Sequence, residues 1–288
     1  MTSDGYNLLT IDAEDWYQLV GRLFTTGEKC RPDILTRQLD RLLDLLERHG
    51  CRATFFCLGI SMVNCPELVR RIADAGHEIG SHGWGHEPIR QIGLDRFRAD
   101  LRRSLSWLQD VLGRPVAGYR APEFSVDPDQ LEAFYDICLE EGLKYDSSVF
   151  PIHGRRYGIP RAAAEPSVVR EKNGRRLVEF PLATVAGLGR RWPVAGGLYW
   201  RLLPSWTIRS VLNRIHREGR PAVLYFHPQE FDKERLDVSL AAPGSKAARR
   251  RAAAQNLRRG SVYDKLDVML SRYRFMAIED YLRERQIL

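Results

Sequence analysis

Short apolar runs alternate with longer amphipathic stretches along most of this 288-residue chain, and that alternation constrains the fold more than any other feature. Residues 8–11 are apolar except for Thr10, and residues 222–226 are a short run of apolar and aromatic residues, as expected of buried strands. Residues 34–50 and 94–113 instead place apolar side chains at helical spacing. Repeated alternation of strand and helix predicts a parallel sheet, and about seven such units predict a closed or nearly closed α/β barrel. An open, doubly wound sheet is the alternative.

Length and composition allow one large domain or two smaller ones. No run of eighteen apolar residues predicts a transmembrane helix. The first residues, MTSDGYNLL, lack the basic start and apolar stretch of a secretory signal, so we expect a cytoplasmic protein. No cysteine pair has the C-x-x-C spacing, so we expect buried, reduced thiols and neither disulfides nor a cysteine zinc site. The cysteines are Cys30, Cys51, Cys57, Cys65 and Cys138.

The net charge of +7 is concentrated in residues 244–260, which carry six positive charges and no acidic residue. The remainder is nearly neutral, and no aromatic residues interleave with these arginines, so nucleic-acid binding is not predicted. Two interpretations of Lys246–Arg259 stay open. The segment is a solvated surface helix, or it contacts an anionic membrane or a polyanionic substrate.

Polar residues with metal-binding chemistry follow two of the predicted strands. Asp12 and Glu14 are two residues apart, so on an extended segment they point the same way, and Asp15 follows directly. His82 and His86 are four residues apart and share a face if their segment is helical. Two imidazoles and one carboxylate form a site for Zn, Co, Ni or Fe with positions left for water and substrate. Solvated carboxylates and core histidines are the plainer interpretation of each pair.

Three further strand ends carry polar residues. Arg120 can hold a carboxylate in its ionised state, and the turn at Glu123 can present a backbone N–H to a reacting oxygen. His227 can act as a general acid, with Asp146 setting its tautomer and raising its pKa. A surface arginine, a capping aspartate and a core histidine remain the alternatives.

Five ordered segments, TIDAED, SHGWGH, YRAPEF, YDSSVFP and LYFHP, lie between Leu8 and about Asp232. With them the chain resembles the polysaccharide deacetylases with the NodB homology domain, carbohydrate esterase family 4. Later segments, such as PVAGGLYWRLLP, resemble a subgroup encoded with bacterial exopolysaccharide and exosortase (PEP-CTERM type) loci. The resemblance implies a distorted (β/α)7-type barrel. It also implies one deacetylase domain over residues 1–288, with a subgroup-specific C-terminal extension at about 233–288.

The resemblance also implies a role for each matching residue. Asp12 corresponds to the catalytic base and Arg120 to the arginine that orients it. His82 and His86 correspond to the metal ligands. His227 corresponds to the general acid, and Asp146 to the carboxylate that tunes it.

One segment departs from the family pattern. The common motif places a second, metal-binding aspartate directly after the base, but here Ala13 follows Asp12. Some members place this ligand two positions on, which indicates Glu14 in this chain, in agreement with the same-face argument. Asp15 is the alternative ligand if the strand end bulges.

The implied reaction is metal-dependent hydrolysis, with Zn as the expected metal, that removes N-acetyl groups from amino sugars of an exopolysaccharide or its lipid-linked precursor. Two alternatives remain: an amidohydrolase of the same fold acting on a cyclic amide or ureide, and a non-catalytic carbohydrate-binding protein. A lipid-linked substrate at the inner membrane would fit peripheral contact through Lys246–Arg259. Several aromatic residues are candidates for sugar stacking. They are Trp16, Tyr17, Trp84, Trp192, Tyr199 and Trp200.

Overall fold

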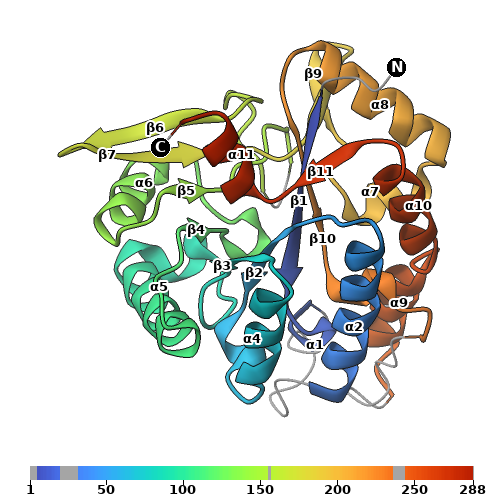
Figure 1. The fold of residues 1–288 in the computed structure, drawn as a ribbon. Helices are drawn as coiled ribbons and strands as arrows, with labels where there is room; N and C mark the ends of the chain where they lie inside the picture. The colour runs from blue at the N-terminus through green and yellow to red at the C-terminus, as the bar shows by residue number, and fades with distance from the viewer. Residues whose placement is uncertain (1–4, 20–31, 155–156, 236–243, 288) are drawn as a thin grey trace.

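A curled, mostly parallel sheet surrounded by helices forms the centre of the protein (Figure 1). The computed structural model describes residues 5–19, 32–154, 157–235 and 244–287. The architecture confirms the expected α/β class and distorted barrel. In spatial order the strands are β10 (Ala222–Phe226), β1 (Tyr6–Ala13), β2 (Thr54–Cys57), β3 (Glu78–Ser81), β4 (Gly118–Tyr119), β5 (Tyr145–Asp146), β7 (Arg175–Glu179) and β6 (Ser167–Lys172), with β11 (Arg274–Met276) paired to β1.

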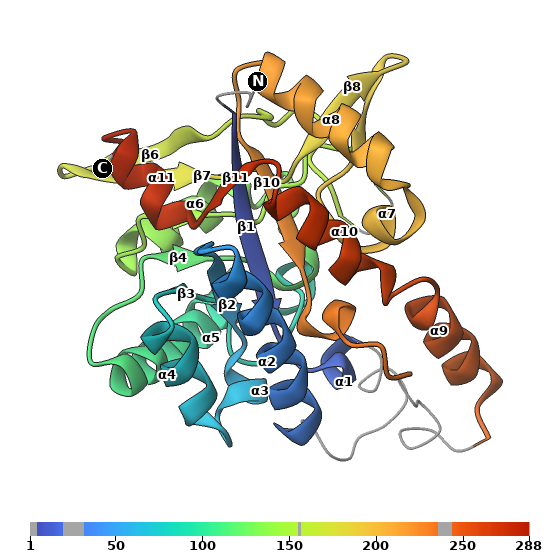
Figure 2. The ribbon, with the colours of Figure 1, turned by 45° about the vertical axis from the view of Figure 1, so that its right-hand side comes forward.

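Helices join the strands and cover the outside of the sheet (Figures 1 and 2). They are α1 (Trp16–Leu19), α2 (Pro32–Arg48), α3 (Gly59–Met62), α4 (Pro66–Asp74), α5 (Ile89–Leu112), α6 (Leu131–Glu140), α7 (Gly197–Leu202), α8 (Ser205–Arg217), α9 (Lys246–Asn256), α10 (Ser261–Leu270) and α11 (Ile278–Glu284). Two short 3-10 helices, η2 (Pro122–Phe124) and η3 (Pro228–Phe231), follow β4 and β10.

Strand β1 is the central element of the sheet. It pairs in parallel with β10 along one edge, and its other edge is shared by β11 near residue 6 and β2 near residue 12. Seven of its eight residues are buried, in agreement with the apolar residues Leu8, Leu9 and Ile11 at its centre. The carboxyl ends of β1, β2, β3 and β10 therefore meet on one side of the sheet, where Asp12 lies.

Local sequence signals account for the helix boundaries. Helix α2 buries a leucine stripe that includes Leu35, Leu39 and Leu42. Pro66 occupies the first turn of α4, where its missing N–H costs nothing. Gly113 ends α5 in the left-handed conformation, with φ of 69°.

Two antiparallel hairpins were not predicted. Strands β6 and β7 form the first, and β8 (Thr184–Gly187) pairs with β9 (Arg190–Pro193) in a separate two-stranded sheet. The first hairpin turns at Asn173 and Gly174, both with positive φ. An Asn-Gly pair between alternating residues is a readable hairpin signal. The second turns at Leu188-Gly189, which carries a weaker signal.

The C-terminal segment packs onto the same sheet, because β11 pairs with β1 and α10 contacts α7. Helix α9 extends away from the sheet (Figure 2) and exposes Lys246, Arg249 and Arg250. Arg259, by contrast, is buried and donates to the Gln229 carbonyl at 2.6 Å. The prediction that the whole of Lys246–Arg259 forms a solvent-facing basic surface is therefore wrong at Arg259.

Cys51, Cys57, Cys65 and Cys138 are buried, as the sequence predicts. Cys30 lies outside the described residues. No helix within the described ranges is both long enough and apolar enough to cross a lipid bilayer.

Candidate active site at the carboxyl end of the sheet

Three acidic side chains are buried where β1 ends. Asp12, Glu14 and Asp15 are 2%, 1% and 1% exposed. Burying a carboxylate is costly unless a cation or hydrogen-bond donors compensate, so the partners of each side chain define its role. The structure gives the three acids three different sets of partners.

Glu14 lies with His82 and His86, and one donor atom of each side chain falls within 4.8 Å of the others. Glu14 Oε2 is 2.8 Å from His86 Nε2. All three residues are buried, and they are the one group in the described part of the chain with the composition and spacing of a metal site. Two imidazoles and one carboxylate suit a divalent transition ion, so this donor set fits the metal that the sequence predicts.

A loop, not a helix, brings the two histidines together. His82 follows β3 directly, and the chain then turns through left-handed conformations at Gly83 (φ 77°) and His86 (φ 56°). Asp100 on α5 fixes this loop by accepting hydrogen bonds from Trp84 N at 2.7 Å and Gly85 N at 2.9 Å. The two histidines, four residues apart, thus lie beside Glu14 because the loop between them turns. Their segment is not helical.

The hydrogen bonding of His82 sets its tautomer. Its Nδ1 lies 2.9 Å from the Arg120 carbonyl oxygen, which only accepts, so Nδ1 carries the proton and Nε2 keeps its lone pair. Burial lowers the pKa of His82 and outweighs the opposite effects of Asp12 and Glu14. The neutral imidazole, which is the metal-binding form, is therefore favoured.

Glu14 is ionised despite its burial. Burial alone would raise its pKa, but His86, followed by His82 and His227, lowers the pKa to about 2. Glu14 consequently offers a charged carboxylate between three imidazoles.

Asp15 points elsewhere. Its Oδ1 accepts a hydrogen bond from Tyr17 N at 2.7 Å, and its backbone N lies 3.3 Å from Ser61 Oγ. This carboxylate thus bonds the first turn of α1 and is not a member of the Glu14–His82–His86 group.

Asp12 is held by Arg120, which is fully buried. Arg120 Nη1 donates to Asp12 Oδ1 at 2.8 Å and to Thr10 Oγ1 at 2.7 Å. Its Nε and Nη2 donate to the backbone oxygen and the hydroxyl of Ser147, and its guanidinium lies 4.4 Å from the centre of the Phe56 ring. These contacts fix the orientation of the Arg120 guanidinium, which in turn orients the Asp12 carboxylate.

His227 follows β10 and faces the same centre. Its Nε2 lies 3.4 Å from Glu14 Oε1, and its Nδ1 lies 3.6 Å from Glu230 Oε2. Burial would lower its pKa, but Glu230, followed by Glu14 and Asp12, raises the pKa above the ordinary value for histidine. A proton therefore stays on this ring to higher pH than on a free imidazole.

Glu230 is the site residue that sequence reasoning missed. It is fully buried, and its Oε1 lies 3.1 Å from Arg201 Nε. Burial opposes ionisation, but His227 and Arg201 together lower the pKa of Glu230. Its side chain also accepts from His227 N at 3.2 Å, as in a helix capping box. A glutamate three residues after His227 was the available signal.

Asp146 does not contact His227 in the structure. Its two oxygens accept from Ser148 Oγ at 2.7 Å and Ser148 N at 3.0 Å. Burial raises the pKa of Asp146, and burial followed by Asp146 itself raises the pKa of Glu179 beside it. Both carboxyls are therefore harder to ionise than free carboxyls, and they stabilise the turn whose Ser147 binds Arg120.

The turn after β4 carries unusual backbone. Glu123 (φ 55°) and Phe124 (φ 51°) are both left-handed, a conformation that non-glycine residues keep only where the surroundings require it. Phe124 N donates to Ala121 O at 3.1 Å. A backbone N–H near Glu123 as donor to a reacting oxygen stays a prediction.

The aromatic candidates for sugar stacking divide into two groups. Trp16, Tyr17 and Trp200 are buried in the core. Trp192 is 39% exposed, and Trp84 and Tyr199 are half-buried. The last three have ring surface that a ligand can reach.

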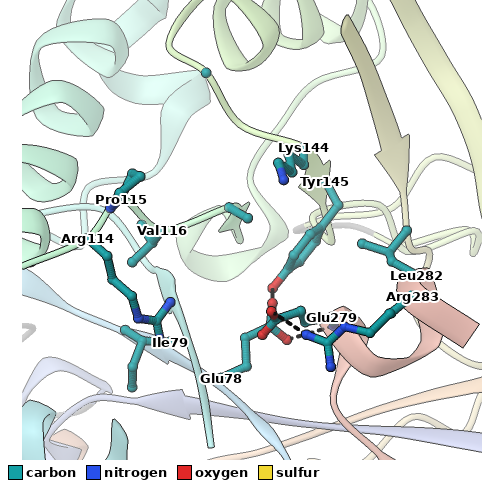
Figure 3. A pocket seen from close by; sticks show the side chains of 12 residues that line it. Glu78, Ile79, Arg114, Pro115, Val116, Lys144, Tyr145, Glu279, Leu282 and Arg283 are labelled. Atoms are coloured by element: carbon teal, nitrogen blue, oxygen red, sulfur yellow. Dashed lines mark hydrogen bonds and ion pairs between the residues drawn. The ribbon is translucent and has the colours of Figure 1, made fainter. Parts of the chain in front are cut away.

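A second set of buried polar groups lies at the amino-terminal end of the strands (Figure 3). Glu78, the first residue of β3, lines a cavity of about 400 Å³ together with Tyr145 and Arg283. Glu78 accepts from Thr54 Oγ1 at 2.6 Å, Tyr145 Oη at 2.7 Å and Glu279 N at 3.0 Å. Burial outweighs these bonds and raises the pKa of Glu78 to about 7. These contacts attach α11 to the sheet.

The site combines a buried metal-type donor set, an arginine-held carboxylate and a proton-carrying histidine, as in metal-dependent hydrolases. Comparison with known proteins found two family models that match parts of the chain. Residues 26–137 match the family model described as Polysaccharide deacetylase, and residues 147–283 match the one described as Domain of unknown function (DUF3473). A peptidoglycan deacetylase of Helicobacter pylori is 33% identical over 140 residues, which cover 46% of each protein.

Solved structures show the fold. A Mycobacterium smegmatis protein assigned to the polysaccharide deacetylases aligns with 99% of this chain and 92% of its own, at a TM-score of 0.59 and 22% identity. An allantoinase aligns with 96% of this chain and 89% of its own, at a TM-score of 0.60 and 13% identity. Residues 26–137 are therefore similar to the polysaccharide deacetylases, and the chain spans about half the length of the Helicobacter pylori relative.

Each of the two matched segments contributes residues to the candidate site. His82, His86 and Arg120 lie within the deacetylase match, and His227 and Glu230 lie within the second match. Asp12 and Glu14 precede both. A single sheet joins the segments, because β1 pairs with both β2 and β10.

Proposed function

We propose that the protein is a metal-dependent N-deacetylase that hydrolyses the N-acetyl group of an amino sugar within a saccharide. The observation that carries this proposal is the buried group Glu14–His82–His86, placed next to the Arg120-bound Asp12 and to His227. The polysaccharide deacetylase match and the relative named as a peptidoglycan deacetylase support the choice of an acetylated saccharide.

Glu14, His82 and His86 would hold the metal, with Zn as our first expectation and Co, Ni or Fe as alternatives. When bound, such an ion supplies Lewis acidity to the acetyl carbonyl and lowers the pKa of a neighbouring water. Asp15 is not part of this ligand set, since its carboxylate bonds the backbone of α1.

The protein's own groups move the protons. Arg120 aims the Asp12 carboxylate, which acts as the base and accepts a proton from the attacking water. His227 holds a proton because Glu230 and Glu14 raise its pKa, and it donates that proton to the amine as the C–N bond breaks. In this proposal Glu230 takes the tuning role that the resemblance gave to Asp146. Asp146 acts indirectly. It binds Ser148, and the neighbouring Ser147 positions Arg120.

The substrate we infer is an N-acetylated saccharide of a bacterial exopolysaccharide or of its lipid-linked precursor. A lipid-linked substrate at the inner face of the cytoplasmic membrane would bring the exposed residues Lys246, Arg249 and Arg250 of α9 to anionic lipid. Binding to vesicles containing phosphatidylglycerol should weaken when these three residues become glutamine. Equal binding by this variant and the wild type would contradict a membrane role for α9.

Acetate release from chitotetraose, measured beside metal content, tests the activity. We expect turnover that chelation abolishes and Zn restores. Hydrolysis of allantoin without acetate release would favour the cyclic-amide alternative, for which the allantoinase likeness in fold is the supporting observation. Saccharide binding with no hydrolysis at any metal would indicate a non-catalytic binding protein and contradict the proposal.

A further inference from the structure

A hollow with aromatic and basic walls lies at the β8–β9 hairpin. Its volume is about 410 Å³, and Tyr157, Trp192 and Tyr199 line it together with His153, Arg190 and Arg191. No acidic side chain contributes to its wall within the described ranges. The hollow thus combines aromatic ring surfaces with positive charge, and no acidic side chain among the described lining residues neutralises that charge.

The two arginines have no carboxylate partner among the described residues, whereas others, such as Arg98, Arg170 and Arg176, are ion-paired. Arg190 lies over the Trp192 ring at 3.7 Å, and that ring's Nε1 donates to Gly187 O at 3.0 Å. The hairpin therefore holds the Arg190 guanidinium in place without neutralising its positive charge. Arg190, Arg191 and His153 also line a second hollow of about 290 Å³ beside the first.

Aromatic contacts connect this hollow to the candidate catalytic centre. The Tyr157 ring packs on Phe124 with centroids 5.8 Å apart, and Phe124 packs on Tyr225 at 5.0 Å. Tyr225 in turn packs against His227 at 5.8 Å. Tyr199 follows Gly196, which pairs with Tyr225. Two rings, those of Phe124 and Tyr225, thus lie between Tyr157 in the wall of the hollow and His227, which places the hollow near the candidate catalytic centre.

We propose that this hollow, named here the arginine subsite (Tyr157, Arg190, Arg191, Trp192 and Tyr199), binds an anionic group of the saccharide, either a carboxylate or a phosphate. Guanidinium groups bind both anions through paired N–H donors, and aromatic faces stack on sugar rings. The inference rests on the proposed function for the identity of the saccharide, but binding at the arginine subsite does not require turnover. The substrate class is thereby narrowed to acidic N-acetylated saccharides.

Calorimetric titration with matched acidic and neutral ligands tests the arginine subsite. The probes are N-acetylglucosaminyl-N-acetylmuramic acid, its methyl ester, UDP-N-acetylglucosamine and N-acetylglucosamine. For the wild type at low salt we expect at least one acidic probe to bind about tenfold tighter than its neutral counterpart, or 1.4 kcal/mol. The acid and ester pair reports on carboxylate, and the UDP-sugar pair reports on phosphate.

Three variants decide the assignment. Arg190→Gln with Arg191→Gln should remove the preference for the acidic probe, whereas Arg190→Lys with Arg191→Lys should retain part of it. The control Arg272→Gln removes an exposed arginine outside the subsite and should retain all of it. Equal affinities for acidic and neutral probes in the wild type, or a preference that survives the glutamine changes, would overturn the proposal. A preference without acetate release would leave the subsite standing and refute the deacetylase.

Discussion

Both ends of this barrel bury a glutamate, and the two side chains behave in opposite ways. Glu14, at the carboxyl end of β1, lies among imidazoles and has its pKa lowered to about 2. Glu78, at the amino end of β3, is surrounded by hydroxyl and amide donors, and its pKa is raised to about 7. Burial opposes ionisation at both positions, so the neighbouring groups determine the outcome.

The difference separates a reactive end from a stabilising end. A charged Glu14 is suited to bind a cation, whereas Glu78 accepts hydrogen bonds that hold α11, β2 and β5 together. Barrels of α/β type place their chemistry at the carboxyl ends of the strands and their stabilising contacts at the other end. In this protein Glu14 has histidine partners at the carboxyl end, and Glu78 has hydroxyl and amide partners at the amino end, in agreement with that division.

The largest expected effect comes from removing the charge of Glu14. Glu14→Gln should abolish metal retention and reduce acetate release below detection, because the histidines lose their anionic partner. The matched change Asp15→Asn should keep both, since asparagine also caps a helix. Metal content and turnover are measured on the same preparations. If Asp15→Asn lost the metal and Glu14→Gln retained it, Asp15 and not Glu14 would be the acidic metal ligand.

Next in size is the loss of the cation beside Asp12. Arg120→Met leaves a buried carboxylate without its partner and should reduce the free energy of unfolding by about 3–5 kcal/mol. Arg102→Met removes an arginine that is 63% exposed and paired with Glu141, and should change it by less than about 1 kcal/mol. Urea unfolding of both variants checks this contrast. Equal, small losses would mean that Arg120 does not hold a buried charge.

The opposite end predicts a smaller, pH-dependent effect. The pKa of Glu78 is near its ordinary value of 4.5 in the unfolded chain and about 7 in the folded protein, so between these values the folded state binds the extra proton. The residue's contribution to the free energy of unfolding is complete below pH 4.5 and falls by roughly 3 kcal/mol as the pH rises to 7.

Glu78→Gln should remove this dependence. The difference in stability between variant and wild type isolates Glu78, because His77, whose pKa burial lowers to about 4, contributes equally to both proteins. Unfolding in urea across pH 4 to 8 gives the curve. A difference that stays flat with pH would show that Glu78 has an ordinary pKa.

Sequence patterns predicted the barrel and named most of the residues that the structure brings together in the candidate site, for identifiable reasons. The strands of a parallel sheet are continuous apolar runs, and polar residues at their ends stand out against them, as Asp12, Arg120 and His227 do. Choosing Glu14 over Asp15 required the backbone, since both are buried and only hydrogen bonding distinguishes them. Glu230 was hidden because a glutamate in a turn reads as solvated surface. The β8–β9 hairpin was missed because Leu188-Gly189 is a weak turn signal.

The smallest expected effect is a shift in the pH profile of turnover. Glu230→Gln removes the carboxylate that does most to raise the pKa of His227, so the alkaline limb of kcat should move to lower pH. Glu234→Gln, which alters an exposed glutamate paired with Arg37, is the control and should leave the profile in place. An unchanged profile in Glu230→Gln would remove Glu230 from the proton-donating step.

The most direct test of the account is a calorimetric titration with zinc. It compares the chelator-treated wild type with the chelator-treated His82→Ala variant. We predict one tightly bound zinc per wild-type chain and none in His82→Ala, with both proteins folded by circular dichroism. A wild-type protein that binds no zinc, cobalt, nickel or iron, or a His82→Ala variant that binds zinc as tightly as wild type, would contradict the metal centre at Glu14, His82 and His86.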